Sequence, residues 1–202
     1  MNSAASVRAR LLNLSKQTGE DFQALLNRYA IERFLYRLGA SDQADEFILK
    51  GAMLFVVWQG NLHRPTKDLD LLGFGDSTPE AVADRIRPVV RIPSDDGIQF
   101  DASSIEAAVI REDAEYEGVR VKLPASLDQA QIRLQVDIRF GDVVDPAPAR
   151  AAYPAILSHV EPPTLRMYPP ETVIAEKLQA MVVLDIRNSR MKDFYDLWYL
   201  SR

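Results

Sequence analysis

The chain contains no cysteine among its 202 residues. This absence excludes disulfide bonds, thiolate nucleophiles and zinc sites built from cysteine. Histidine is scarce as well, because only His63 and His159 are present and they lie far apart in the sequence. A histidine-rich metal site is therefore not expected, and any bound metal ion would be held by oxygen ligands.

Long hydrophobic runs are also missing. Uncharged apolar stretches such as residues 52–58 are far shorter than the roughly 20 residues that a membrane-spanning helix needs. The amino terminus carries Arg8 and Arg10, but no sustained apolar segment follows them as it would in a secretory signal. We therefore expect no membrane association and a cytoplasmic location.

An excess of positive charge is absent too, since the formal net charge is −5. Sequence-independent binding to nucleic acid relies on many lysines and arginines, so a broad nucleic-acid coating is not expected and a local basic groove remains possible. The composition is 47% hydrophobic and 26% charged, which fits one globular domain or one domain with a small helical annex.

Hydrophobic spacing predicts the order of helices and strands. Spacings of three and four residues indicate helix over residues 6–38, with breaks at Gly19 and Gly39, and spacings of two indicate a sheet over residues 98–140. The other predicted elements are strands at 47–49 and 67–72, helices at 52–58 and 79–90, turns at 117–118 and 124–129, a surface connection at 145–163, and helices opening at 170 and at Ser189.

Two carboxylates stand two residues apart inside an apolar run, at Asp68 and Asp70. In a strand these side chains project from the same face while Leu69 and Leu71 point into the core. Two ionised acids held this close repel each other unless a cation lies between them. The pattern predicts a site for a hard divalent ion such as magnesium, and the alternative is a solvated strand edge or turn.

A third aspartate lies on a later strand. Residues 132–140 alternate so that Asp137 lies on the polar face, between basic neighbours such as Arg133 and Arg139. Asp137 is therefore either a further metal ligand or a cross-strand partner of a nearby arginine.

The carboxyl-terminal region places a lysine among apolar residues. Lys177 falls within the apolar arc of the helix that opens at residue 170, and a buried ammonium needs a partner. Asp193 and Asp196 lie one turn apart on the next helix, and either could approach it. The alternatives are that Lys177 extends along its aliphatic stem to water and that both aspartates are surface acids. The aromatic residues Trp58, Phe194 and Trp198 are predicted to belong to the core.

Together these motifs resemble a known superfamily. A glycine turn before a short helix, an Asp-x-Asp on the following strand and the later Val136-Asp137-Ile138 resemble the DNA polymerase beta type nucleotidyltransferases. The chain is also similar, from residue 47 to its end, to the AbiEii family of nucleotidyltransferase toxins from type IV toxin–antitoxin systems. The strings that carry this similarity are Leu49-Lys50-Gly51-Ala52, Arg64-Pro65-Thr66-Lys67-Asp68-Leu69-Asp70, Glu176-Lys177-Leu178 and Lys192-Asp193-Phe194-Tyr195-Asp196-Leu197.

The resemblance implies an α+β nucleotidyltransferase fold, with a mixed twisted sheet, amino-terminal helices and a carboxyl-terminal helical segment. We expect helices over residues 1–45, a catalytic core over 46–165 and a helical segment over 166–202. Related proteins usually continue into a larger helical region, so the resemblance also implies that this chain is a shortened form.

The resemblance further implies a role for each motif residue. It implies two magnesium ions, bound by Asp68, Asp70 and Asp137, and a nucleoside triphosphate as substrate. The other implied roles are phosphate binding by the amides of Gly51 and Ala52, a triphosphate contact from Lys177, charge compensation on pyrophosphate by Arg64 and Lys67, and the last acidic motif position for Asp193. Ala52 departs from the family, which usually has glycine or serine there, and alanine tolerates a left-handed backbone poorly.

The implied reaction moves a nucleoside monophosphate from a nucleoside triphosphate to an acceptor hydroxyl. The resemblance implies that the acceptor is tRNA, modified at its 3′ end, and that a cognate antitoxin relieves the toxicity. Two alternatives remain open at the level of sequence. One is a nucleotidylase that modifies proteins, and the other is a catalytically silent nucleotide-binding or docking module.

Overall fold

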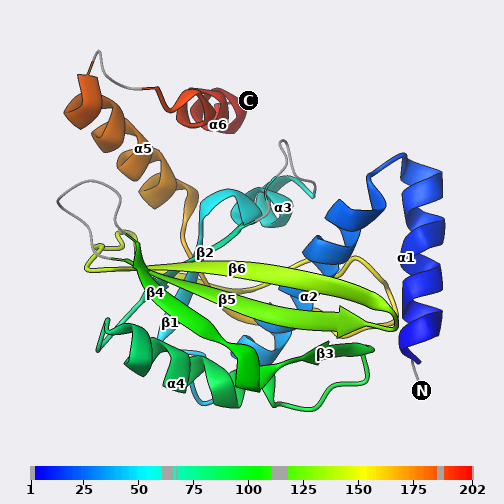
Figure 1. Cartoon of the computed structure of the whole chain (residues 1–202). Helices are drawn as coiled ribbons and strands as arrows, with labels where there is room; N and C mark the ends of the chain where they lie inside the picture. The colour runs from blue at the N-terminus through cyan, green and yellow to red at the C-terminus, as the bar shows by residue number, and fades with distance from the viewer. Residues whose placement is uncertain (1–2, 61–65, 67, 111–117, 186–188, 202) are drawn as a thin grey trace.

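The computed structural model describes residues 3–60, 66, 68–110, 118–185 and 189–201 (Figure 1). Its centre is a curled eight-stranded mixed sheet with the strand order β3-β5-β6-β2-β1-β8-β7, in which β4 also pairs with β5. Helices lie on both sides of the sheet, and α5 and α6 stand on the opposite side from α4 (Figure 1). The predicted α+β fold class is confirmed.

The strands are β1 (Phe47–Lys50), β2 (Asp68–Gly73), β3 (Ile98–Phe100), β4 (Glu106–Ile110), β5 (Gly118–Leu127), β6 (Ala130–Phe140), β7 (Ala149–Ala152) and β8 (Thr164–Met167). The helices are α1 (Ala4–Thr18), α2 (Phe22–Gly39), α3 (Leu54–Gln59), α4 (Pro79–Val90), α5 (Pro170–Leu184) and α6 (Met191–Leu200), with 3₁₀ turns η1 (Gly51–Met53) and η2 (Ala102–Ser104). Within the described part of the chain, we found no helix with the length and apolar character needed to cross a membrane.

The amino-terminal helices begin and end where the sequence provides caps. The Ser3 hydroxyl accepts a hydrogen bond from the Ser6 amide at the start of α1, and Gly19 ends that helix in a left-handed conformation. The Asp21 carboxylate caps α2 by accepting from the Ala24 amide at 2.8 Å. The predicted helical region with a break at Gly19 is therefore confirmed, and both helices share one apolar core with the sheet.

The middle of the sheet is formed by β1, β2 and β6. Strand β2 runs antiparallel to β1 and parallel to β6, so it is bordered by a partner on each side. Its Leu69 and Leu71 are fully buried, as are Val136 and Ile138 of β6. Because a slip of one residue would move these side chains to the other face, their burial fixes the register of the three strands.

Three local predictions are wrong. Residues 124–127 belong to β5 and not to a turn, which is confined to residues 128–129. Pro124 lies between the stretches of β5 that pair with β3 and with β4, and its carbonyl on that side accepts a hydrogen bond from the Asp101 amide at 2.9 Å. No neighbouring strand requires a backbone N–H from residue 124 on that side, so proline is tolerated there. Strand β7 interrupts the predicted surface connection, and Arg190 replaces Ser189 as the residue that precedes α6.

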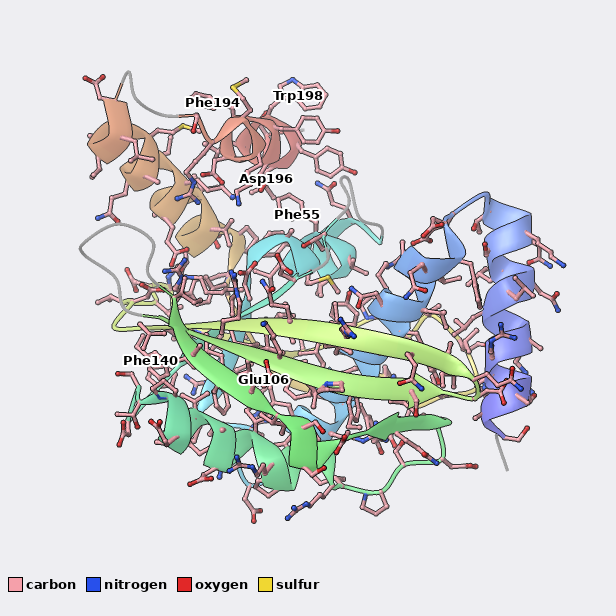
Figure 2. The ribbon with its side chains drawn as sticks, viewed as in Figure 1. Phe55, Glu106, Phe140, Phe194, Asp196 and Trp198 are labelled. Atoms are coloured by element: carbon pink, nitrogen blue, oxygen red, sulfur yellow. The ribbon has the colours of Figure 1, made fainter. Side chains whose placement is uncertain are left out.

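The predicted core position of two aromatic residues is also wrong. Phe194 is 46% exposed and Trp198 is 48% exposed, because α6 turns that face away from the sheet (Figure 2). The predicted division of the chain at residues 45 and 165 stays a prediction.

A buried ion pair fixes α2 against the segment that leads into β3. Both amino groups of Arg37 donate to the Asp96 carboxylate, at 2.6 and 3.1 Å, and the two side chains are almost completely buried. Tyr29 of α2 donates to the Asp96 carbonyl at 2.8 Å. These contacts satisfy polar groups that would otherwise lie unpaired inside the core.

We expect the substitution Arg37→Leu to lower the free energy of unfolding by about 3–5 kcal/mol, because it leaves the Asp96 carboxylate buried without its cation. Urea unfolding at neutral pH measures this loss. The control is Arg87→Leu, which breaks an exposed pair with Asp84 and should cost no more than about 1 kcal/mol. Equal losses in the two variants would contradict the assignment of Arg37 to the core.

Candidate active site

The strand register brings the predicted acids together on one face of the sheet. Asp70 of β2 is the direct partner of Asp137 of β6, and Asp68 is the partner of Gln135. Directly paired residues in neighbouring strands project from the same face, and so do residues two apart in one strand. Asp68, Asp70 and Asp137 therefore rise from adjacent positions, opposite the face that carries the buried leucines.

The surroundings of Asp70 are poor in solvent and rich in negative charge. Burial raises the pKa of its carboxyl from 3.8 to about 6, and the nearby charges of Asp137 and Asp68 add to this increase. The cations of Lys50 and Lys192 act in the opposite direction without cancelling it. A carboxylate in this setting is stabilised by an additional cation, which is the electrostatic condition for binding a divalent metal ion.

Asp137 is buried and already has a cationic partner. Arg120, its cross-strand partner in β5, donates from Nε and Nη2 to the two carboxylate oxygens at 2.9 and 2.8 Å. The interpretation of Asp137 as a cross-strand partner of an arginine is thus confirmed, although the arginine is neither Arg133 nor Arg139. The sequence alone did not identify Arg120.

Whether the three acids can bind a divalent cation depends on their donor atoms and on how the strand register places them. In the described part of the chain, no group of three or more histidine, aspartate or glutamate side chains is arranged so that it could hold a metal ion. The three acids supply the oxygen donors that magnesium prefers, but Asp137 is turned to Arg120. A shared metal site therefore requires Arg120 to release or share the Asp137 carboxylate.

Gly51 closes the site on the β1 side. Its φ angle is +76°, and a Cβ atom at this position would lie 2.2 Å from Oδ2 of Asp70. Only glycine combines this backbone conformation with so close an approach. The neighbouring Ala52 is buried in η1, and only Asp128 and Asp185 have positive φ among the described residues other than glycine, so the departure from glycine or serine creates no backbone strain.

A second polar cluster lies beside the acids and was not predicted from the sequence. Lys50 is the β1 partner of Asp70, and its ammonium donates to Asp142 at 2.5 Å and to Glu176 of α5 at 2.9 Å. Tyr168 donates to Asp142 at 3.2 Å, and burial raises the pKa of its hydroxyl. Lys50 and Glu176 stand in the strings that resemble the AbiEii family, which is the only signal that could have drawn attention to them.

A third cluster joins the two carboxyl-terminal helices. The Lys177 ammonium lies 2.8 Å from a carboxylate oxygen of Asp193 and 2.8 Å from one of Asp196. Asp193 is 1% exposed and Asp196 is fully buried, so the interpretation of these residues as surface acids is wrong. Arg190 also contacts Asp193, at 2.7 Å. Lys177 thus holds both of its candidate partners, and it does not extend to water.

Helix α6 lies above α3, the helix that follows the Gly51 turn (Figures 1 and 2). The ring centroids of Phe55 in α3 and Tyr199 in α6 are 6.0 Å apart. This contact brings the carboxyl-terminal helices over the acid-bearing side of the sheet. Three residues considered in the sequence, His63, Arg64 and Lys67, lie outside the described residues.

Known proteins resemble the chain at the level of family and fold. No curated protein matches it. Two solved Helicobacter pylori structures share its fold at 18% identity. One is JHP933, with a TM-score of 0.55 over 88% of this chain and 66% of that one. The other is described as a candidate nucleotidyltransferase, with a TM-score of 0.57 over 90% and 69%. The present chain thus spans about two thirds of the length of these proteins.

The family match covers most of the chain, from residue 33 to residue 202. It includes all three aspartates and both lysine clusters described above. The matched family is described as the nucleotidyl transferase AbiEii toxin of type IV toxin–antitoxin systems. The chain belongs to this family.

Proposed function

We propose that this protein is a magnesium-dependent nucleotidyltransferase that moves a nucleoside monophosphate from a nucleoside triphosphate to a hydroxyl and releases pyrophosphate. The observation that carries the proposal is the pairing of Asp70 with Asp137 on one sheet face, two residues from Asp68 and directly under Gly51. Membership of a nucleotidyltransferase family supports it.

In this proposal Asp68, Asp70 and Asp137 hold two magnesium ions. When bound, the ions supply positive charge that stabilises the attacking and leaving oxygens of an in-line transfer. The raised pKa of Asp70 supports this assignment, because a cation at this position would relieve the repulsion among the acids. The backbone amides of Gly51 and Ala52 open η1 next to Asp70 and would donate to the phosphates. Arg64 and Lys67 are further phosphate-binding candidates from the sequence.

Arg120 acquires a role in the same proposal. Its guanidinium must leave the Asp137 carboxylate, at least in part, before that carboxylate can bind a metal ion. The side chain is 36% exposed, so it has room to turn toward solvent or toward a bound phosphate. A planar guanidinium pairs with phosphate oxygens as readily as with a carboxylate.

The acceptor that we propose is tRNA, modified at its 3′ end, and the proposed partner is a cognate antitoxin. The support is the family description, which names a toxin of a type IV system. A protein with these properties would act in the cytoplasm, as the absence of long hydrophobic runs led us to expect.

Transfer is tested by incubating the protein with magnesium, each labelled nucleoside triphosphate in turn, total tRNA and a cell extract. We expect label on RNA. Label on protein would instead indicate a protein-modifying nucleotidylase, and bound nucleotide without transfer would indicate a silent binding module.

In this assay Asp68→Asn, Asp70→Asn and Asp137→Asn should each reduce the transfer rate by a factor of about 100 or more, because each removes a proposed ligand of the magnesium ions that would stabilise charge developing in the transition state. Asp84→Asn, which changes an exposed acid of α4, should leave the rate unchanged and serves as the control. Wild-type rates in all three site variants would show that the site is misplaced.

Gly51→Ala should abolish nucleotide and metal binding, because its new methyl group would collide with the Asp70 carboxylate. The matched control is Gly60→Ala. Gly60 has a similar φ angle of +79°, but a Cβ atom there would meet nothing within 4 Å. Both variants carry the same type of backbone strain, so a greater loss of binding in Gly51→Ala, measured by calorimetry, isolates the steric effect. Equal binding in the two variants would contradict the closure of the site by Gly51.

Binding of magnesium should depend on pH through Asp70. The pKa of its carboxyl is raised to about 6, so protons compete with the metal ion below that pH. Thermal unfolding should therefore show a larger stabilisation by magnesium at about pH 7.5 than at about pH 5. Without magnesium, the stability of the fold should instead decrease as the pH rises from 3.8 to about 6. In this range the folded protein retains the proton on Asp70, whereas the unfolded chain has already lost it. Asp70→Asn should remove both effects, and an unchanged pH dependence in that variant would exclude Asp70 as their source.

A further inference from the structure

The position of α6 assigns different roles to two lysines. Asp193 and Asp196 face α5, where both contact Lys177. Tyr199 faces α3, where its ring lies 6.0 Å from that of Phe55. These contacts fix the orientation of α6 about its own axis, so the direction of its remaining side chains follows from helical periodicity.

Lys192 lies on the face of α6 that is turned to the active-site side. It precedes Tyr199 by seven residues, which is two helical turns, and therefore shares a face with it. Tyr195 lies between them, and its ring stacks with that of Tyr199 at 6.3 Å. Phe55, which this face contacts, follows Gly51 by four residues, and Gly51 covers Asp70.

Electrostatics agree with this placement. The positive charges of Lys50 and Lys192 both lower the pKa of Asp70. Lys50 lies next to Asp70 in the sheet, and Lys192 comes from a segment more than a hundred residues later in the chain. The Lys192 side chain is exposed, so its ammonium can exchange water for a ligand.

Lys177 is held in a different way. It is only 14% exposed, and two carboxylates lie within 2.8 Å of its ammonium. Those carboxylates are more deeply buried than the lysine itself. Moving Lys177 onto a phosphate would leave two buried negative charges without this partner, which is strongly unfavourable.

We propose that α6 is the second wall of the nucleotide site, where Lys192 binds the triphosphate, and that Lys177 is a positioning residue that holds α6 in place through Asp193 and Asp196. This inference rests on the proposed function and deepens it. It replaces the triphosphate contact that the family resemblance implied for Lys177.

The first test measures binding of each nucleoside triphosphate to the full chain by equilibrium dialysis, with magnesium and without acceptor. Lys192→Met should raise the dissociation constant about tenfold or more, as expected for loss of a charge-assisted hydrogen bond. Its unfolding temperature should stay at the wild-type value, because the side chain is exposed. Lys122→Met, which changes an exposed lysine of β5, is the matched control and should bind as the wild type does.

The second test separates a positioning role from a direct contact. Lys177→Met should lower the unfolding temperature and weaken nucleotide binding together. The triple variant Lys177→Met, Asp193→Asn, Asp196→Asn removes the ammonium and both buried charges that it neutralised. We expect the triple variant to recover most of the stability and also the nucleotide affinity. If Lys177→Met does not fold, the triple variant alone decides between the two roles.

Each failure has a distinct meaning. If the triple variant is stable but binds nucleotide more than tenfold less tightly than the wild type, Lys177 contacts the triphosphate itself and the inference is overturned. Wild-type affinity in Lys192→Met overturns the assignment of Lys192, even where transfer to the acceptor is impaired. A wild-type protein that binds no nucleoside triphosphate would instead overturn the proposed function.

Discussion

The repulsion between Asp70 and Asp137 is the constraint on which the rest of the site depends. Buried leucines on the opposite face fix the register of β2 against β6, so the two carboxylates cannot move apart without exposing the core. Positive charge surrounds them in compensation. Arg120 pairs with Asp137, while Lys50 and Lys192 lower the pKa of Asp70. The pKa of the Asp70 carboxyl nevertheless stays raised at about 6, and one more cation would therefore stabilise its ionised form.

The part of the site that could be predicted from sequence is the part encoded by local periodicity. Two residues in one strand share a face whatever the strand pairs with, so Asp68 and Asp70 could be placed together at once. The same reasoning placed Asp137 on the polar face of β6. Apolar alternation also gave the position of the strands that carry these acids, because it depends on residues that are neighbours in the chain. The close approach of Gly51 to Asp70 joins two separate segments and was not predicted.

The rest depends on contacts between distant segments, for which one sequence carries no signal. Lys50 meets Asp142 across 92 residues and Glu176 across 126. The strand order, and hence the pairing of Arg120 with Asp137, follows from the topology of the whole sheet. Strands β7 and β8 are four-residue strands at one edge of the sheet, so they lack the alternation that revealed β6. The exposed face of α6 was wrongly predicted to be buried, because amphipathic spacing identifies an apolar face but does not say what covers it.

Helix α5 connects the sheet to α6 through two consecutive residues. Glu176 reaches back to Lys50 beside the acids, and Lys177 reaches forward to the two buried aspartates of α6. Neighbouring residues of a helix point about 100° apart, so one turn of α5 can hold both partners at once. The apolar side chains of α5 contribute less to this arrangement, since Val182 and Val183 are largely exposed. The position of α6 is therefore set by ion pairs to α5 together with the contact between the rings of Tyr199 and Phe55. Because such pairs require a defined geometry, they also restrict how far α6 can shift or rotate relative to α5.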